Sequence, residues 1–371
     1  MGGARKVGPG RRTGAGVLGA RMLGARMLGA RMLGARMLGA RMLGAVVLGT
    51  VAVAAGCTAT PGRATTGGAA GAAPPRISGT ADVAYAGSLQ LLDDKTIGPA
   101  FTRATGAAYQ GRGGGAVGLS HEIASGEIHP NVFESVGSAP ITALEPRYTS
   151  WYVQLAASPI VVAYDPGGRF GAQLAAIAHR TRPLADLFRL LEQPGFLLGR
   201  TNPGTDPQGQ AFVEMVELAQ HALHLPAGTA SKVLGPLDNP AQVFSETSLE
   251  ARLEAGQLDA ASAFLSQAVQ LHLPYIALPS TIDFGDPALA STYAQASVTL
   301  HDGRVVHGTP LTVDVTTIGH HDPAAAAAFV AYLLSPAGRA AMGAGGYQLL
   351  TPTVVGTRSA VPGAVRHVLG R

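Results

Sequence analysis

The sequence predicts an α/β fold with two lobes, and three observations lead to this prediction. Short apolar segments that favour strands alternate along the chain with longer amphipathic segments that favour helices. Glycine, proline, asparagine and aspartate cluster between these segments, as is typical of turns. The part of the chain that shows this alternation begins at Ile77 and is about 290 residues long, which exceeds the usual length of one domain.

The alternation assigns an approximate range to each expected element. Strands are expected at 81–87, 158–164, 195–201, 260–265, 275–279, 297–300 and 311–318. Helices are expected at 89–104, 116–125, 183–192, 208–224, 247–255 and 323–343. Such alternation favours largely parallel sheets, in which ligands bind beyond the carboxyl ends of the strands.

The basic charge of the chain belongs to its N-terminal leader. The first 56 residues hold nine of the 27 basic residues and none of the 23 acidic ones. The rest of the chain therefore has 18 basic residues and a net charge of −5. An acidic folded part argues against a nucleic-acid partner.

The leader itself is typical of an export signal. The pentapeptide RMLGA occurs five times between Arg21 and Ala45, and a period of five fits no common structural repeat. The uncharged residues 42–56 are too few to span a membrane as a helix but suit the hydrophobic region of a signal peptide. We therefore predict that residues 1–56 are a signal peptide.

Cys57, the only cysteine of the chain, follows a run of small residues. This arrangement resembles a bacterial lipobox, in which the thiol is lipidated and becomes the new N-terminus; the alternative is an ordinary signal peptide that happens to carry a cysteine. The lipobox interpretation implies an extracytoplasmic lipoprotein that is anchored to the outer face of the cell membrane. Residues 57–77, which are small, polar and proline-bearing, are predicted to be the lipidated cysteine and a flexible tether.

Three junctions between a strand and a helix carry residues suited to binding a small anion. Ser88 directly follows the first expected strand, at the start of a helix. The glycine-rich stretch 111–120, GRGGGAVGLS, lets backbone amides approach an anion before the next helix begins. Asp206 and Pro207 are typical of an N-cap and a first helical residue. Each feature alone is more typical of helix capping, but several helix starts that face one crevice form an oxyanion site.

Six stretches distributed over the folded part match the sequence pattern of one known family. They are AYAGSL (84–89), TSWYVQLAASPIVVAYDP (149–166), GRTNPGTDPQGQAF (199–212), LEARLEAGQLDAASAFLSQAVQLHLPYIALP (249–279), TYAQASVTL (292–300) and AFVAYLLSPAGRAAMGAGGYQLLTP (328–352). Through them the chain, from about Asp82 to Thr353, resembles the extracellular solute-binding proteins of ABC importers, in particular the tungstate/molybdate-binding group.

This resemblance implies a type II periplasmic-binding-protein fold, in which two α/β lobes are joined by two crossing hinge strands. Residues 78–162 and 309–356 would form lobe I, residues 163–308 lobe II, and residues 357–371 a C-terminal tail. The implied function is to capture a tetrahedral oxyanion, with tungstate or molybdate as the first choice, and to deliver it to an ABC permease. The implied protein is a monomer that is not an enzyme and carries no cofactor and no resident metal.

Three site residues follow from the resemblance position by position. Ser88 matches the family's first anion-binding serine. Asp206, in the sequence DPQG that also contains Gln208, matches an aspartate that contacts the metal atom of the oxyanion. Tyr293 occupies the place of a tyrosine near the ligand.

The sequence departs from the family pattern at two ligand positions. The family's second serine aligns with Ala116, so the backbone amides of Gly114, Gly115 and Ala116, or the hydroxyl of Ser120, would have to replace it. The family's second metal-contacting carboxylate, a glutamate, aligns with Ala263, which puts expansion of the metal from four to six ligands in doubt.

Arg200 stands where the family usually has an apolar residue. An arginine can pair two oxygens of an oxyanion, so this difference favours a plainly tetrahedral anion, and sulfate, phosphate or another small anion is the alternative ligand. The other interpretation of Arg200 is a surface side chain near the hinge.

Two rival functions have weaker support in the sequence. Gly113, Gly115 and Gly118 satisfy the dinucleotide pattern G-x-G-x-x-G, but the residues before them do not form an apolar strand. A metal-binding lipoprotein would have to use histidines that are scattered along the chain without carboxylates at a ligand-like spacing; these are His221, His224, His301, His307, His320 and His321.

Overall fold

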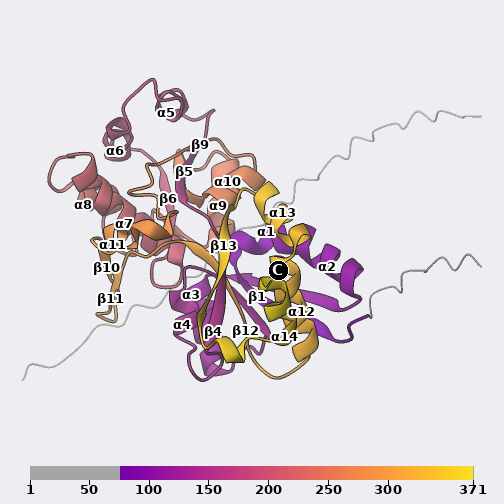
Figure 1. Cartoon of the computed structure of the whole chain (residues 1–371). Helices are drawn as coiled ribbons and strands as arrows, with labels where there is room; N and C mark the ends of the chain where they lie inside the picture. Colours follow the sequence, from indigo (N-terminus) through magenta and orange to yellow (C-terminus); the bar gives the residue numbers. More distant parts are fainter. Residues whose placement is uncertain (1–75, 371) are drawn as a thin grey trace, which may run out of the picture. The chain divides into compact units, whose positions relative to one another are not determined.

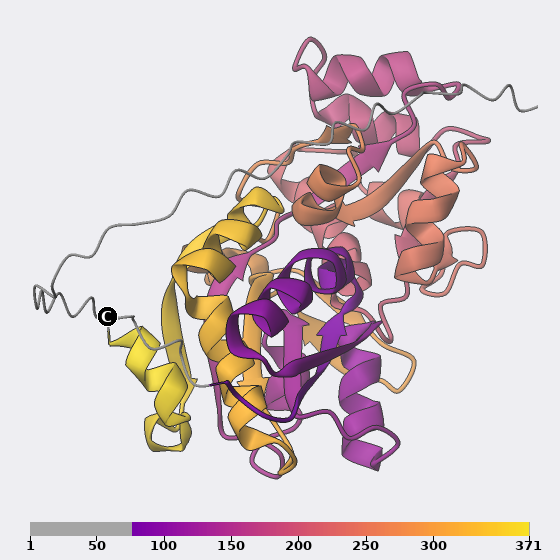
Figure 2. The same cartoon turned by 90° about the vertical axis from the view of Figure 1, so that its right-hand side faces the viewer.

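The computed structural model describes residues 76–370, which form two α/β lobes (Figure 1). The signal peptide, the RMLGA repeats, Cys57 and nearly all of the expected tether lie outside the described residues. Figure 2 shows that the lower lobe is built from both ends of the described chain, whereas the middle of the chain forms the upper lobe. Each lobe contains one mixed sheet, in agreement with the α/β fold that the sequence predicts.

The first lobe is built on a six-stranded sheet with the order β13-β4-β12-β3-β1-β2. Its parallel part is β2-β1-β3, and β12 then pairs antiparallel with both β3 and β4, as β13 does with β4. The strands are β1 (Thr80–Ala86), β2 (Ala108–Gly114), β3 (Val132–Val136), β4 (Trp151–Ala157), β12 (Thr312–Thr317) and β13 (Gln348–Gly356).

Helices cover this sheet, and the long apolar α12 packs on β1 and β12 while α3 packs on β1 and β3. The first-lobe helices are η1 (Gly87–Leu89), α1 (Gln90–Leu92), the π-helix η2 (Asp93–Ile97), α2 (Gly98–Thr105), α3 (Ala116–Ser125), α4 (Ala139–Thr142), α12 (Pro323–Leu334), α13 (Pro336–Ala344), η4 (Arg358–Ala360) and α14 (Gly363–Leu369). The predicted C-terminal tail thus contains α14, which packs against α12 with Val361 and Val365 buried.

The second lobe is built on a five-stranded sheet with the order β7-β6-β8-β5-β9. Its strands are β5 (Ile160–Tyr164), β6 (Leu198–Thr201), β7 (Val243–Phe244), β8 (Ala260–Phe264) and β9 (Tyr275–Ile276), and β10 (Ser297–Thr299) and β11 (Val305–His307) form a separate hairpin. Its helices are α5 (Gly171–Ala178), α6 (Ala185–Leu191), α7 (Pro207–Ala222), α8 (Thr229–Leu234), α9 (Glu246–Glu254), α10 (Leu265–Gln270), η3 (Pro287–Leu289) and α11 (Ala290–Tyr293).

The chain crosses between the sheets twice, after β4 and before β12. The two crossings lie side by side, because the N–H of Ser158 donates to the carbonyl of Leu311 over 3.0 Å. The whole of β5 pairs in the second sheet, so the change of sheet comes at Ser158 and Pro159. The lobe boundary that we expect after residue 162 therefore falls inside β5.

The expectation of largely parallel sheets was wrong, since β12, β4 and β13 in the first lobe and β5 in the second run antiparallel to neighbours. The seven expected strands all appear, at β1, β5, β6, β8, β9, β10 and β12. Six further strands were not expected from the sequence: β2, β3, β4, β7, β11 and β13.

Two helix starts show how the local sequence fixes elements near the lobe junction. The Oδ1 atom of Asp206 accepts the N–H of Gln208 at 2.8 Å, which caps α7, and Pro207 occupies its first position. The hydroxyl of Ser335 likewise caps α13, with Pro336 in its first turn. Within residues 76–370, no single helix has the length and apolarity to cross a membrane, although the bent pair α12 and α13 together meet the length and composition test.

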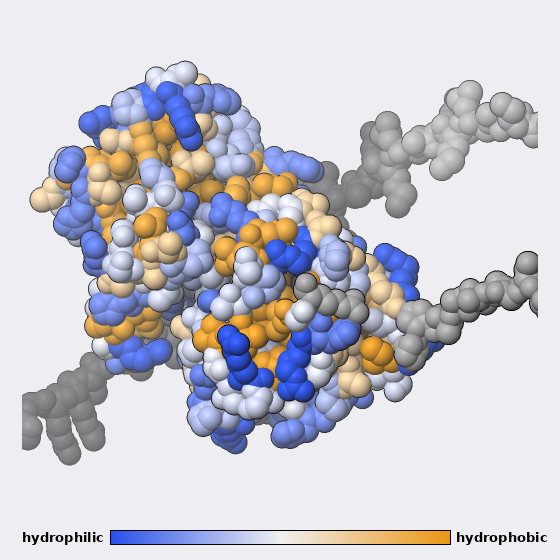
Figure 3. Space-filling model, viewed as in Figure 1, coloured by the Kyte–Doolittle hydropathy of each residue, from blue (hydrophilic) through white to orange (hydrophobic). Residues whose placement is uncertain are grey.

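The visible surface alternates between hydrophobic and hydrophilic residues over both lobes (Figure 3). Among the described residues the large exposed apolar side chains are Leu91, Leu197, Val305 and Leu349.

Candidate ligand-binding site

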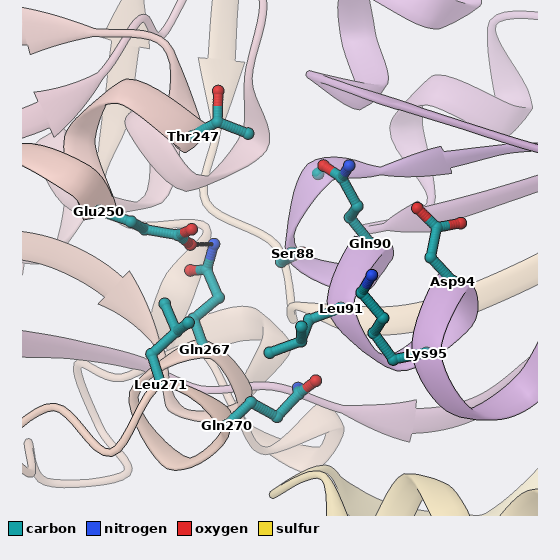
Figure 4. Close-up of a pocket in the computed structure, with 11 residues that line it drawn as sticks. Ser88, Gln90, Leu91, Asp94, Lys95, Thr247, Glu250, Gln267, Gln270 and Leu271 are labelled. Carbon is teal, nitrogen blue, oxygen red and sulfur yellow. Dashed lines mark hydrogen bonds between the residues drawn. The ribbon is translucent and has the colours of Figure 1, made fainter. Parts of the chain in front are cut away.

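A cavity of about 240 Å³ lies between the two lobes (Figure 4), and we call it the interlobe cavity. Its first-lobe wall comes from η1, α1 and η2, directly after β1, and its second-lobe wall from α9 and α10. The residues that line it are Gly87, Ser88, Gln90, Leu91, Asp94, Lys95, Thr247, Glu250, Gln267, Gln270 and Leu271. Polar side chains thus converge on it from both lobes, as expected for a small polar solute.

Ser88 lines the interlobe cavity at the end of β1. Only 3% of the residue is exposed, and its Oγ atom has no hydrogen-bond partner among the described residues. Its carbonyl accepts a hydrogen bond of 2.9 Å from the hydroxyl of Tyr347, which fixes the backbone of η1. Because leaving a buried hydroxyl without a partner is costly, Ser88 Oγ is suited to meet a ligand.

A chain of hydrogen bonds links the Asp206 loop to the interlobe cavity. The side-chain amide of Gln208 donates to Gln267 Oε1 at 2.9 Å, and Gln208 Oε1 accepts the hydroxyl of Ser262 at 2.7 Å. Gln267 Nε2 donates in turn to Glu246 Oε1 at 2.7 Å and to Glu250. Gln208 therefore acts as a buried bridge, whereas Gln267 and Glu250 reach the cavity itself.

Three carboxyl groups of the second lobe crowd together at this site, and burial raises the pKa of each. Burial raises the pKa of Asp206 to about 6, against the lowering effect of its hydrogen bond from the Gln208 N–H. Burial raises the pKa of Glu250 to about 7, and the charges of Glu254 and Asp206 add to this effect. Burial also raises the pKa of Glu246 well above its usual range, and the charges of Asp206 and Glu250 add to this effect.

The cation that lines the interlobe cavity is Lys95, on the wall opposite Glu250 (Figure 4). The site therefore attracts an anion only if it is partly protonated or if the ligand interacts with carboxyl oxygens.

The glycine-rich stretch contacts the second lobe next to Asp206. The N–H of Gly118 donates to the carbonyl of Thr205 at 3.2 Å. A Cβ atom on Gly115 would lie 2.5 Å from that carbonyl oxygen, so a side chain there would push the lobes apart. Gly114 ends β2, and Ala116 is buried at the first position of α3. The structure thus brings this stretch close to Asp206, but at the lobe contact rather than among the residues that line the cavity.

Three other residues of the expected site point away from the interlobe cavity. The hydroxyl of Ser120 donates to the carbonyl of Pro140 at 2.8 Å, inside the first lobe. The hydroxyl of Tyr293 donates to the carbonyl of Ser280 at 2.6 Å, and its ring packs on Phe284. Both hydroxyls are therefore engaged within their own lobe.

Arg200 is the third of these residues. Its Nη2 atom donates to the carbonyls of Pro236 and Leu237 at 3.1 and 2.7 Å, and its Nε atom to Gln242 Oε1 at 3.2 Å. The residue is fully buried, so it is not the surface side chain of the other interpretation. Burial lowers the pKa of the guanidinium to about 10. Arg200 fastens β6 to the loop that precedes β7, and it is not directed at the interlobe cavity.

Glu246, Glu250 and Gln267 are not among the site residues expected from the sequence. The two glutamates lie at or next to the helix expected at 247–255, but nothing in their spacing distinguishes them from a solvated helix face. Gln267 follows β8 at the start of α10, so the rule that places ligands at strand-to-helix junctions could have found it.

The rival functions gain nothing from the geometry. The strand β2 does precede the G-x-G-x-x-G pattern, which corrects our expectation, but β2 is a mostly exposed edge strand. The six histidines considered as metal ligands are exposed or scattered, and the described part of the chain has no group of three or more His, Cys, Asp or Glu residues able to hold a metal ion.

The two α/β lobes, the two chain crossings and the cavity between the lobes, which polar side chains of both lobes line, together define a solute-binding protein of the periplasmic type. Residues 81–348 match the family described as bacterial extracellular solute-binding protein, and the chain belongs to this family.

Two curated relatives illustrate the similarity. A putative ABC transporter molybdenum-binding protein of Haloferax volcanii is 31% identical over 259 residues, which cover 70% of this chain and 78% of the relative. The molybdate/tungstate-binding protein WtpA of Pyrococcus abyssi is 24% identical over 229 residues, which cover 56% of this chain and 65% of WtpA.

Among solved structures, the periplasmic molybdate-binding protein of Azotobacter vinelandii matches 74% of this chain and 100% of its own length, with 15% identity and a TM-score of 0.50. This likeness shows the two-lobed fold that we expect. The family consists of binding proteins rather than enzymes and is described as extracellular, in agreement with the expected class and compartment.

Proposed function

We propose that this protein is the lipid-anchored, substrate-binding component of an ABC importer. It captures a tetrahedral oxyanion, and molybdate or tungstate is the preferred candidate. The proposal depends on the interlobe cavity, which Ser88 lines from one lobe and Gln267 and Gln270 line from the other (Figure 4). The hydroxyl of Ser88 has no hydrogen-bond partner among the described residues. The names of the two relatives support the choice of ligand and of transporter. The protein acts as a monomer and passes the anion to its permease.

The proposed ligand contacts come from both lobes. Ser88 supplies its hydroxyl and Lys95 its ammonium group, which favour the oxygens of an anion. Gln267 must first release Glu246 or Glu250, because both of its amide hydrogens are donated to these carboxyl groups. The resemblance implies that Asp206 contacts the central atom of the oxyanion, but Asp206 caps α7 and does not line the interlobe cavity. Ala263 has no carboxylate to contribute to the ligand. Its side chain belongs to an apolar cluster that also contains Val161.

A protonated oxyanion such as hydrogen phosphate is the second candidate. Glu250 lines the interlobe cavity, and Glu246 and Asp206 lie behind it in the same crowded group. A carboxylate can accept a hydrogen bond from the O–H of such an anion, whereas a fully deprotonated dianion offers no donor. Sulfate is the matched test anion, since it has the same shape and no proton at neutral pH.

Isothermal titration calorimetry against molybdate, tungstate, sulfate and phosphate tests the ligand. We expect submicromolar binding of molybdate and tungstate and much weaker binding of sulfate. Tighter binding of phosphate than of molybdate would favour the second candidate. If none of the four anions binds, the oxyanion function is wrong.

The membrane anchor is tested separately at Cys57. Expression in a bacterial host with labelled palmitate should give a labelled protein in the membrane fraction. The Cys57→Ser variant should carry no label and should be absent from the membrane fraction. Release of unlabelled wild-type protein into the medium would support an ordinary signal peptide instead.

A further inference from the structure

Glu246 begins α9 in the second lobe, yet its carboxyl group lies against the backbone of the first lobe. A Cβ atom built on Gly87 would be 2.0 Å from Glu246 Oε2 and 2.9 Å from its carboxyl carbon. The same carboxyl group lies close enough to the backbone N–H of Ser88 for this N–H to lower its pKa, against the larger raising effect of burial. Only glycine at position 87 leaves room for this approach.

The other carboxyl oxygen of Glu246 is held by its own lobe. Gln267 Nε2 donates to Oε1 at 2.7 Å, and Gln267 Oε1 accepts the N–H of Phe264 at 2.8 Å, which orients the amide. The carboxyl group thus bridges the two lobes, and only 8% of the residue is exposed. The hydroxyl of Ser88, which has no hydrogen-bond partner within residues 76–370, lies on the same first-lobe turn.

An oxygen atom that accepts the Ser88 N–H is what a bound oxyanion would supply at this place. The Oε2 atom of Glu246 and an oxyanion oxygen cannot both occupy it, because atoms in non-bonded contact stay more than about 2.5 Å apart even in strong hydrogen bonds.

We propose, on the basis of the proposed function, that Glu246 is an interlobe latch that takes the place of a ligand oxygen at Ser88 and holds the ligand-free cleft closed. An incoming oxyanion displaces the carboxyl group and takes over its contact. Glu246 therefore sets the affinity of the site, although it need not contact the bound anion.

Two other hydrogen bonds join the lobes at this side and remain when the latch is removed. Gln270 Nε2 donates to the carbonyl of Gly345 at 3.1 Å, and Gly118 donates to Thr205. The latch differs from these contacts because it alone involves a backbone N–H of the Ser88 turn and an ionisable side chain.

Small-angle X-ray scattering of the full chain without ligand tests the latch directly. We expect Glu246→Ala to have a larger radius of gyration than the wild type, and Glu246→Gln, which keeps an acceptor oxygen, to resemble the wild type. Glu254→Ala is the matched control, because Glu254 is exposed on the same helix. Equal radii of gyration of the ligand-free wild type and Glu246→Ala, whether both proteins are compact or both are open, overturn the latch.

Calorimetry with molybdate adds a second measurement. Removing the competing carboxyl should tighten molybdate binding by about tenfold in Glu246→Ala, the equivalent of one modest hydrogen bond. The affinity should stay unchanged in Ser120→Ala, because the Ser120 hydroxyl is engaged inside the first lobe. Weaker binding by Glu246→Ala contradicts the displacement. If no variant binds any oxyanion, the proposed function fails while the scattering comparison still decides the latch.

Gly87→Ala offers an independent route should Glu246→Ala fold poorly. The added methyl group would collide with Glu246 Oε2 and expel the carboxyl group without deleting it. An open ligand-free form of Gly87→Ala supports the latch, and a closed form argues against it.

Discussion

Ser88 has a hydroxyl that is buried at the interlobe cavity without a hydrogen-bond partner among the described residues. We expect Ser88→Ala to weaken molybdate binding by about 10- to 100-fold, because a hydrogen bond to a charged acceptor contributes about 1.5 to 3 kcal/mol. Its stability should change little, since the hydroxyl makes no hydrogen bond to any residue that the structure describes. Calorimetry measures the affinity and thermal unfolding the stability.

Ser120→Ala is the control for this experiment. The Ser120 hydroxyl is also buried but donates to Pro140, so its removal should lower stability by about 1 kcal/mol and leave the affinity unchanged. Equal affinities of the wild type and Ser88→Ala would remove Ser88 from the site.

The buried carboxyl groups of Asp93 and Glu134 should make the stability of the protein depend on pH. Both side chains are buried in the first lobe, and none of their four oxygens has a hydrogen-bond partner in the described part of the chain. Burial raises the pKa of Glu134 to about 8, and burial together with Glu134 and Asp94 raises the pKa of Asp93. The folded state therefore binds more protons than the unfolded state between about pH 4.5 and 8, so stability falls as pH rises through this window.

Replacing Glu134 with Gln should remove much of this dependence. We expect the variant to be more stable than the wild type by about 1 to 3 kcal/mol at pH 9 and to differ little at pH 5, because a neutral amide needs no proton to be buried. Urea unfolding at the two pH values measures the difference. A wild type that is as stable at pH 9 as at pH 5 would show that the carboxyls are stabilised in another way.

At the scale of elements, Arg200 joins β6 to the loop that leads into β7 and α9. We expect Arg200→Ala to lower the stability by about 2 to 4 kcal/mol, because the carbonyls of Pro236 and Leu237 lose their donors in a buried place. Oxyanion affinity in the folded fraction should stay within about threefold of the wild type. A large loss of affinity without a loss of stability would return Arg200 to the binding site.

The elements that the sequence predicted are those with a clear apolar pattern. β1, β5 and β8 are buried along their whole lengths or nearly so, and they were found. β2 was missed because its sequence AYQGRGG is glycine-rich and largely exposed at the sheet edge, where pairing with β1 rather than side-chain burial holds it. β3 was missed because Glu134 interrupts its apolar run.

At the scale of the molecule, the sequence could predict only those residues of the candidate site that lie where a strand passes into a helix. Ser88 and the capping role of Asp206 could be derived, since each lies where a strand passes into a helix. The role of Glu246 depends on how closely the two lobes approach, and no local pattern encodes that distance. Arg200 was misjudged because its partners, Pro236, Leu237 and Gln242, are about 40 residues away in the sequence.

Closure of two lobes on an anion should stabilise the whole folded part by mass action. A ligand present at about 1,000 times its dissociation constant stabilises the folded state by about 4 kcal/mol. Since about 1 kcal/mol shifts the melting temperature by about 2 to 4 °C in a domain of about 200 residues, millimolar molybdate or tungstate should raise it by several degrees. Sodium chloride at equal ionic strength is the control for general salt effects, and Ser88→Ala should show a smaller rise at the same molybdate concentration. Equal melting temperatures in molybdate, tungstate and chloride would mean that neither oxyanion binds the folded state in preference to the unfolded one.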